Sequence, residues 1–258
     1  MQLKKAVRTA QTYAAPLLEA KVWTQRKVRS ALRMPSEPSY RAFERFPFDA
    51  GLEFLDIGSN RGQTIASLRL YRPSVPILGF EPNPILMRRL SKLYNSDRST
   101  EIFPFGLGIE SGKFDLYIPH YRGFMFDGLA SFDWSSAHGW LNADRIYGFN
   151  ERHLKVERVQ CEIRRWDDID TRPGLVKIDV QGFEKNVLLG GLETIRRFRP
   201  VFLIENDPER AHEETLFAEG YRRAAYSNSH LIPDTFGVGN TFYIPEEKFS
   251  RLEAAYAG

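Results

Sequence analysis

Residues 54–62 read Phe54-Leu55-Asp56-Ile57-Gly58-Ser59-Asn60-Arg61-Gly62, a short apolar run that leads into a loop with two spaced glycines. The next apolar run ends in Gly79-Phe80-Glu81-Pro82-Asn83. In nucleotide-binding α/β folds, the glycines of such a loop let the backbone approach a ligand, and an acid at the end of the second strand binds a ribose diol. The two segments therefore predict a ribose-containing ligand at the carboxyl ends of two parallel strands.

The acid in front of the loop narrows the choice of ligand. The pattern is D-x-G-x-N-x-G instead of G-x-G-x-x-G, so a carboxylate precedes the first glycine. A carboxylate at this place suits an ammonium group better than a pyrophosphate. S-adenosylmethionine (SAM) carries an amine and a carboxylate on its methionine part and a diol on its adenosine part. We therefore expect SAM as the cofactor.

The expected cofactor contacts follow from the chemistry of SAM. Asp56 binds the methionine amine, directly or through water, and Glu81 binds the ribose diol. Gly58 and Gly62 permit close approach of the backbone. The remaining expected contacts are Asn60 and Thr64 to the methionine carboxylate, and Pro82 and Asn83 beside the adenine.

From residue 53 onward, strand and helix patterns alternate, which is typical of a parallel sheet with helices on both faces. Strands are expected at Glu53–Ile57, Ile77–Phe80, Glu101–Pro104, Leu175–Asp179 and Val201–Glu205. Helices are expected at Gly62–Tyr71, Pro84–Tyr94, Glu184–Phe198 and Pro208–Glu219. Further extended segments are expected at Phe114–Ile118 and Val156–Arg164, and two closing strands joined by a loop at Arg222–Ser227 and Asn240–Ile244.

The segment Pro119–His153 lies between two of those extended runs and is rich in aromatic residues. A connection of this length is usually a functional lid or disordered, and its many rings argue against disorder. Rings beside short polar groups suit a sugar- or ring-binding surface, and the acceptor contacts expected here are Ser131, Trp134 and His138. The alternative is a local hydrophobic minicore that caps the sheet.

The N-terminal segment is basic: residues 1–35 hold eight Lys or Arg and one acid, a charge of +7 that leaves −4 for the rest of the chain. Apolar residues recur there at helical spacing, with a kink at Pro16, so we expect an amphipathic helix followed by a linker. The helix packs on its own domain or on a second subunit, which would make a homodimer. Adsorption of residues 1–33 to an anionic membrane or partner, and a transit segment, are the alternatives. The expected division is 1–38 as extension and linker and 39–258 as the catalytic domain, with 119–153 inserted as a lid.

The composition of the chain limits its expected cellular location and its expected binding partners. No apolar stretch approaches the ~20 residues of a membrane span, and no signal-peptide core follows the N-terminus, so the cytoplasm is the default location. The single Cys161 excludes an internal disulfide and argues against a cysteine metal cluster. We expect no nucleic-acid partner, because the catalytic domain carries no bulk positive charge.

Further motifs bring in a resemblance. They are Val176-Lys177-Ile178-Asp179-Val180-Gln181-Gly182-Phe183-Glu184 and Pro200-Val201-Phe202-Leu203-Ile204-Glu205. Together with the first two segments, they resemble the FkbM family of SAM-dependent methyltransferases. Shorter motifs fall in the same order as in the family: Gly106-Leu107-Gly108, Leu129-Ala130-Ser131, Trp166-Asp167-Asp168-Ile169 and Asn240-Thr241-Phe242-Tyr243-Ile244-Pro245. The resemblance covers roughly residues 50–245.

The resemblance implies a Rossmann-like class I methyltransferase fold, that is, a doubly wound, mostly parallel sheet with an antiparallel closing strand. It also implies methyl transfer, often to hydroxyl groups of sugars, glycans or natural-product-like small molecules. The chain departs from the family at Gln181, where the family usually has Glu. Gln keeps the length and the hydrogen-bonding capacity of Glu but not its charge.

Methyl transfer to a neutral hydroxyl needs alignment, exclusion of water and a base for the hydroxyl proton. Asp179 ends its strand at the ligand-binding edge of the sheet, so we expect it to be the catalytic residue. The alternative is a carboxylate that caps the following helix, with His138, His153 or His230 as the base. Gln181 and Glu205 are expected to contact the acceptor. No metal site is assigned, although Asp179 and Glu205 could gather an ion, and metal dependence stays open.

The leading hypothesis is therefore a SAM-dependent O-methyltransferase that acts on a small-molecule or glycan acceptor. Two alternatives from other classes remain. One is a nicotinamide-dependent oxidoreductase, which would share the ribose-binding acid but not the D-x-G-x-N loop. The other is a non-catalytic glycan-binding or scaffold module that retains a methyltransferase fold.

Overall fold

The computed structural model describes residues 2–13 and 24–257, which fold as two compact units. The sheet unit comprises Arg33–Gly112 and Glu162–Gly258, and the insert unit comprises Met1–Leu32 and Lys113–Cys161. The division predicted at residue 38 stays a prediction. The structure adds that the N-terminal helix and the inserted segment belong to one and the same unit.

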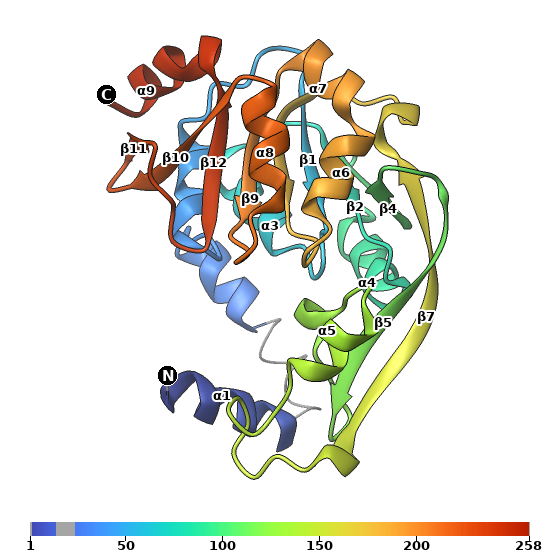
Figure 1. The fold of residues 1–258 in the computed structure, drawn as a ribbon. Coiled ribbons are helices and arrows are strands. Elements are labelled where there is room, and N and C mark those ends of the chain that lie inside the picture. Colours follow the sequence, from blue (N-terminus) through green and yellow to red (C-terminus); the bar gives the residue numbers. More distant parts are fainter. Residues whose placement is uncertain (1, 14–23, 258) are drawn as a thin grey trace. The chain divides into compact units, whose positions relative to one another are not determined.

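The sheet unit is built on an eight-stranded sheet with the order β11-β10-β12-β9-β8-β1-β2-β3 (Figure 1). The strands are β1 (Glu53–Ile57), β2 (Ile77–Phe80), β3 (Thr100–Phe103), β8 (Pro173–Ile178), β9 (Val201–Glu205), β10 (Tyr221–Ser227), β11 (His230–Pro233) and β12 (Asn240–Pro245). The five strands from β3 to β9 are parallel. β12 is antiparallel to both β9 and β10. This order confirms the predicted doubly wound sheet with an antiparallel closing strand.

Helices cover both faces of this sheet because side chains alternate along each strand. Phe54 belongs to one apolar core and the adjacent Leu55 to the other. The first core is closed by η1 (Pro38–Glu44), α3 (Gln63–Tyr71), α4 (Pro84–Tyr94) and α9 (Phe249–Ala257). The second is closed by α6 (Glu184–Gly190), α7 (Leu192–Phe198) and α8 (Ala211–Ala218). Shorter turns are η4 (Trp166–Asp168) and η5 (Glu246–Lys248).

Two local predictions are wrong. The single helix predicted over Glu184–Phe198 is two helices, α6 and α7, which meet at Gly190 and Gly191. A Cβ on Gly190 would lie 1.8 Å from the carbonyl oxygen of Gly108, and one on Gly191 would lie 2.2 Å from the Trp166 ring. The break thus lies where neighbouring chain packs directly against the glycines. The predicted loop between the closing strands contains a further strand, β11, which forms a hairpin with β10.

The insert unit contains α1 (Gln2–Tyr13), β6 (Phe124–Met125), η2 (Asp127–Leu129), α5 (Trp134–Gly139) and η3 (Glu151–His153). The long strands β5 (Gly112–Tyr121) and β7 (Leu154–Arg165) join a second sheet with the order β4-β7-β5-β6, in which β4 is Phe105–Gly108. A small core of Tyr121, Phe124, Phe126, Leu141 and Ile146 fills the insert. Part of the aromatic segment therefore forms the minicore that was one of its two interpretations.

The helix α1 packs on its own chain. Lys5 Nζ donates to the carbonyl of Ala143 at 2.6 Å, the amide of Tyr147 donates to Thr9 Oγ1 at 2.9 Å, and the Arg8 guanidinium lies 4.6 Å from the Trp140 ring centre. Burial and the nearby Arg145 lower the pKa of Arg8. Residues 24–31 are helical, while the predicted Pro16 kink lies outside the described residues. Within 2–13 and 24–257, no helix is both long enough and apolar enough to span a membrane.

Candidate functional site

Four acids of the sheet unit lie at the carboxyl ends of adjacent parallel strands. Asp56 is the next-to-last residue of β1, Glu81 follows β2, Asp179 follows β8 and Glu205 ends β9. Because β2, β1, β8 and β9 are neighbours in the sheet, these acids line one edge. Ligands of open α/β sheets bind at this edge. The structure thus places the predicted cofactor and catalytic acids side by side.

Asp56 carries a buried carboxylate for which the described residues provide no hydrogen bond. Asp56 is 1% exposed to solvent, and neither of its carboxylate oxygens is hydrogen-bonded within the described part of the chain. Burial raises the pKa of Asp56 to about 7, although the Lys177 ammonium opposes the shift. The hydroxyls of Ser59 and Thr64 moderate the shift without forming a hydrogen bond to either oxygen. A buried carboxylate without partners is costly, so its environment suits a cationic ligand group.

The glycines of the loop are required by neighbouring protein. Gly58 and Gly62 have φ angles of +83° and +75°. A Cβ on Gly58 would lie 2.0 Å from the carbonyl oxygen of Asp179, and a Cβ on Gly62 would lie 2.9 Å from Tyr94 Oη. The loop is therefore clamped between the segment after β8 and the helix α4. Close approach of the cofactor to these two glycines stays a prediction.

Glu81 fastens the loop to the segment after β2. It is buried, and its Oε2 accepts from the Asn60 amide at 2.7 Å while its Oε1 accepts from the Asn83 amide at 2.8 Å. Asn60 adopts a positive φ of +49°, which turns its amide toward Glu81. Pro82 lies between Glu81 and Asn83 in the sequence. The Glu81 carboxylate thus links the glycine loop, at Asn60, to the start of α4, at Asn83.

Asn83 begins α4 and has a spare donor. Its Oδ1 accepts from the Ile85 amide at 2.9 Å and from the Leu86 amide at 3.5 Å, the pattern of a helix N-cap. Its Nδ2 is buried and has no acceptor among the described residues. A ligand oxygen or ring nitrogen would satisfy this donor.

Asp179 and Glu205 are joined through the amide of Gln181. Gln181 Nε2 donates to Asp179 Oδ1 at 3.0 Å and to Glu205 Oε2 at 2.7 Å. Gln181 has a φ of +53°, in the left-handed region that glycine favours, so the backbone is strained at this point. The side chain of Asp179 is 36% exposed, which leaves it accessible. The residue that departs from the family pattern therefore holds the two acids together.

Lys177 is a fully buried cation beside these acids. Its Nζ donates to the carbonyl of Ile178 at 3.0 Å and lies 3.7 Å from Asp179 Oδ2. Burial opposes ionisation of Asp179, but the Lys177 ammonium and the hydrogen bond from Gln181 lower its pKa. Burial and the Asp179 carboxylate raise the pKa of Glu205 to about 8. These opposite shifts favour the negative charge on Asp179 over Glu205.

The other residues predicted to contact the acceptor or to be alternative bases lie in the insert unit or on β11, the outermost strand of the large sheet. Trp134 stacks on His138 at a ring distance of 4.5 Å, and Ser131 Oγ accepts from the Asp133 amide at 3.1 Å. The exposed fraction of Trp134 is 50%. His153 packs edge-on against Tyr121 in the insert unit. His230 lies on β11, separated from β9 by β12 and β10.

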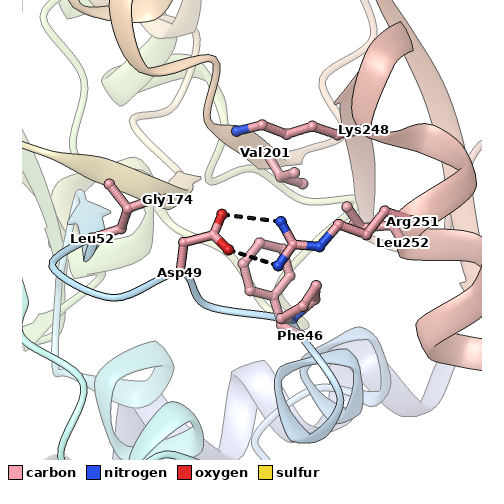
Figure 2. A pocket seen from close by; sticks show the side chains of 9 residues that line it. Phe46, Asp49, Leu52, Gly174, Val201, Lys248, Arg251 and Leu252 are labelled. Atoms are coloured by element: carbon pink, nitrogen blue, oxygen red, sulfur yellow. Dashed lines mark hydrogen bonds and ion pairs between the residues drawn. The ribbon is translucent and has the colours of Figure 1, made fainter.

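A small pocket lies at the opposite end of the same parallel strands, where they begin (Figure 2). Leu52, Gly174 and Val201 line it where β1, β8 and β9 begin. Asp49 and Arg251 form a two-pronged ion pair across it, at 2.6 and 3.1 Å. Hydrogen bonds from Arg251 lower the pKa of Asp49. Asp49 and Arg251 therefore satisfy each other, and Lys248, the third charged residue of the lining, donates to the carbonyls of Phe198 and Arg199.

Sequence reasoning missed two residues of the site. Lys177 could have been found, because a lysine inside the apolar run Leu175–Ile178 must pair with an acid when it is buried. Tyr40 carried no such signal. It lies in η1, and its hydroxyl accepts a hydrogen bond from Thr64 Oγ1 at 3.4 Å. Among the described residues, no group of three or more His, Cys, Asp or Glu side chains is arranged to hold a metal ion.

The sheet order and the row of acids define the class I methyltransferase fold. The model of the methyltransferase FkbM domain matches residues 56–226. The chain therefore belongs to the FkbM methyltransferase domain family.

Two curated relatives are similar over 161 residues. The AMB antimetabolite synthetase AmbE of Pseudomonas aeruginosa is 28% identical over 53% of this chain and 7% of its own length. The 2-O-methyltransferase NoeI of Sinorhizobium fredii is 26% identical over 60% of this chain and 63% of its own length. The chain thus spans less than two thirds of either relative.

Solved structures are similar at low identity. A methyltransferase FkbM from Methylobacillus flagellatus KT has a TM-score of 0.47 at 15% identity, over 78% of this chain and 47% of that one. A precorrin-6y C5,15-methyltransferase from Geobacter metallireducens GS-15 has a TM-score of 0.40 at 11% identity, over 79% of this chain and 82% of that one.

Proposed function

We propose that this protein transfers a methyl group from SAM to a hydroxyl of a sugar, glycan or natural-product-like small molecule. The observation that carries the proposal is the buried Asp56 carboxylate, which has no hydrogen-bond partner among the described residues and lies at the ligand edge of a methyltransferase-family domain. The amine of SAM would supply the missing positive charge. Membership in a methyltransferase family argues against the nicotinamide-dependent oxidoreductase.

The residues present fit SAM. Asp56 would hold the methionine amine, and Asn60 and Thr64 the methionine carboxylate. Glu81, whose oxygens accept from the Asn60 and Asn83 amides, would also accept hydrogen bonds from the ribose diol. On the adenine side, Pro82 would contact the ring and Asn83 would offer its unused Nδ2. When bound, SAM supplies an electrophilic methyl group on a sulfonium.

Asp179 is the residue that we assign to the acceptor hydroxyl. Lys177 and Gln181 keep its carboxylate charged and oriented, so it would accept a hydrogen bond from the acceptor hydroxyl and take the proton as the new C–O bond forms and the C–S bond of SAM breaks. Glu205 and Gln181 line the same position and would contact the acceptor. The aligned edge supplies positioning, which is the main requirement for methyl transfer.

The class of acceptor is supported by two observations. One is the relative from Sinorhizobium fredii, which is named a 2-O-methyltransferase. The other is the half-exposed Trp134 with Ser131 and His138 nearby, since rings beside polar groups suit sugars. We propose the Pro119–His153 segment as the substrate lid on this basis. A cytoplasmic location and a homodimer stay predictions.

Transfer of label from methyl-labelled SAM tests the proposed function. The full chain is incubated with a fractionated extract and with a panel of sugars and hydroxylated small molecules. We expect a labelled product whose methyl group resists mild base, as an ether does. Binding of SAM without labelling any fraction would favour the non-catalytic module, and labelled nitrogen would overturn the hydroxyl acceptor.

Replacing Glu81 by alanine is expected to weaken SAM binding by about 1–3 kcal/mol, because charge-assisted hydrogen bonds to the diol are lost. Calorimetric titration measures the change. Glu101→Ala is the matched control, since Glu101 is an exposed acid on the adjacent strand β3. Unchanged SAM affinity in a folded Glu81→Ala protein would remove Glu81 from the cofactor site.

Substitutions of Trp134 and Trp140 distinguish a role of the insert as a substrate lid from a role as a minicore. Trp134 is half exposed, so Trp134→Ala is expected to raise the acceptor KM about 5- to 20-fold with little change in Tm. Trp140 packs on the minicore between Arg8 and Arg145, so Trp140→Ala is expected to cost about 2–4 kcal/mol of stability. Normal acceptor kinetics in Trp134→Ala would leave the minicore as the role of this segment.

A further inference from the structure

Residues 36–40 of the sheet unit link two parts of the ligand edge, and we call them the N-terminal strap. On one side, the Ser36 amide donates to Ser67 Oγ at 3.0 Å and the Tyr40 hydroxyl accepts from Thr64 Oγ1, so the strap is attached to α3. On the other side, Asn240 Nδ2 donates to Glu37 Oε2 and, at 3.3 Å, to Ser39 Oγ. Asn240 is the register partner of Glu205. The strap therefore joins α3, the helix that follows the cofactor loop, to the strand beside Glu205.

The strap lies outside the segment that matches the family model, which starts at residue 56. Nothing assigned so far gives it a role in binding. Two of the residues it contacts nevertheless belong to the site or lie beside it: Thr64, and Asn240 next to Glu205. Tyr40 is the buried titratable group of the strap.

The ring of Tyr40 is fixed. The residue is 2% exposed and stacks on Phe43 at 5.2 Å, and Phe43 packs edge-on against Phe54 of β1 at 5.6 Å. Phe54 is two residues before Asp56. The hydroxyl position is thus set by the same strand that sets the Asp56 carboxylate.

The phenol of Tyr40 remains protonated and has a hydrogen to give. Burial, and then the charges of Glu37, Asp179 and Asp56, raise its pKa well above the ordinary value. Its oxygen accepts from Thr64 Oγ1, and no hydrogen bond donated by the phenol is found within the described residues. A hydroxyl that accepts one hydrogen bond becomes a better donor of the next.

The charges around this hydroxyl distinguish the amine of an amino-acid ligand from its carboxylate. Two carboxylates, Asp56 and Asp179, favour the amine and repel the carboxylate. A carboxylate placed here needs a donor to offset that repulsion. The structure supplies the Tyr40 hydroxyl, because the hydrogen of Thr64 is already donated to Tyr40 and Thr64 can act only through it.

We propose that Tyr40 is a cofactor-binding residue supplied by the N-terminal strap, and that its hydroxyl donates a hydrogen bond to the methionine carboxylate of SAM. This inference rests on the proposed function. It adds to the site a residue that precedes the family-matched segment, and it assigns Thr64 the task of polarising that donor.

Decarboxylated SAM is the decisive probe, because it keeps the sulfonium, the amine and the adenosine but lacks the carboxylate. Calorimetric titrations compare SAM and decarboxylated SAM on the full chain and on Tyr40→Phe. We expect Tyr40→Phe to weaken SAM binding about 10-fold or more and to change the affinity for decarboxylated SAM less than about 2-fold. Thr64→Val is expected to show the same selectivity in weaker form.

Tyr256→Phe is the matched control. Tyr256 is also buried, and its hydroxyl donates to the carbonyl of Ala42 in η1 at 2.8 Å. It therefore loses a hydrogen bond to the same region without removing a donor from the site. We expect its affinities for both ligands to move together or not at all.

The outcomes separate the inference from the proposed function. An equal loss for both ligands in Tyr40→Phe, or no loss, would overturn the inference while leaving SAM as the cofactor. Failure of the unmodified chain to bind SAM would overturn the proposed function and the inference with it.

Discussion

Replacing Asp179 by asparagine is expected to slow methyl transfer by about 10²–10⁴-fold while SAM binding stays nearly unchanged. Asn has the same shape but cannot accept the hydroxyl proton. The assignment rests on a charged and accessible carboxylate held by Gln181 and Lys177. Single-turnover rates with a labelled acceptor measure the effect.

The structure does not support the alternative role for Asp179, a cap of α6. The N-cap position of α6 is Phe183, no described side chain forms a cap hydrogen bond there, and Glu184 binds the amides of the preceding loop. Glu184 Oε1 accepts from the amides of Val180 and Gly182 at 3.3 and 3.2 Å. Asp234→Asn is the matched control, because Asp234 pairs with Arg222 at the far edge of the same sheet. A single-turnover rate of Asp179→Asn within a few-fold of the parent would exclude Asp179 as the base.

Replacing Gly58 by alanine is expected to cost about 3 kcal/mol or more of stability and to abolish SAM binding. The new Cβ would overlap the carbonyl oxygen of Asp179, at 2.0 Å, so the loop or the segment after β8 has to move. That movement would displace Asp56 and Asp179 together. Chemical denaturation and SAM titration measure the two effects.

Gly51→Ala separates this contact from backbone strain. Gly51 has a φ of +78°, close to that of Gly58, but a Cβ there would meet no atom within 4 Å. Its cost should be about 1–2 kcal/mol, the price of a left-handed side chain. Equal costs at the two positions would show that the contact with Asp179 contributes nothing.

The parallel strands were predictable because each is an apolar run that ends in a turn signal. Glu53–Ile57, Ile77–Phe80 and Val201–Glu205 have the predicted bounds. The acids at the strand ends were predictable for the same reason, since parallel strands bring their carboxyl ends to one edge. The motifs that carry the family resemblance lie in these same segments.

The parts that were missed depend on contacts between segments far apart in the sequence. Gly190 and Gly191 end a helix because Gly108 and Trp166 pack against them, and a local helical pattern cannot show that. Tyr40 precedes every recognised motif, and only the folded chain brings it to Thr64. The bridge from Gln181 to Glu205 likewise spans two strands.

The most direct test of the central claim is a calorimetric titration of the unmodified full chain with SAM, with NAD as the comparison. We expect one SAM to bind per chain with a dissociation constant in the micromolar range, and NAD to produce no binding heat. A chain that binds NAD, or that binds no SAM at millimolar concentration, would contradict the claim.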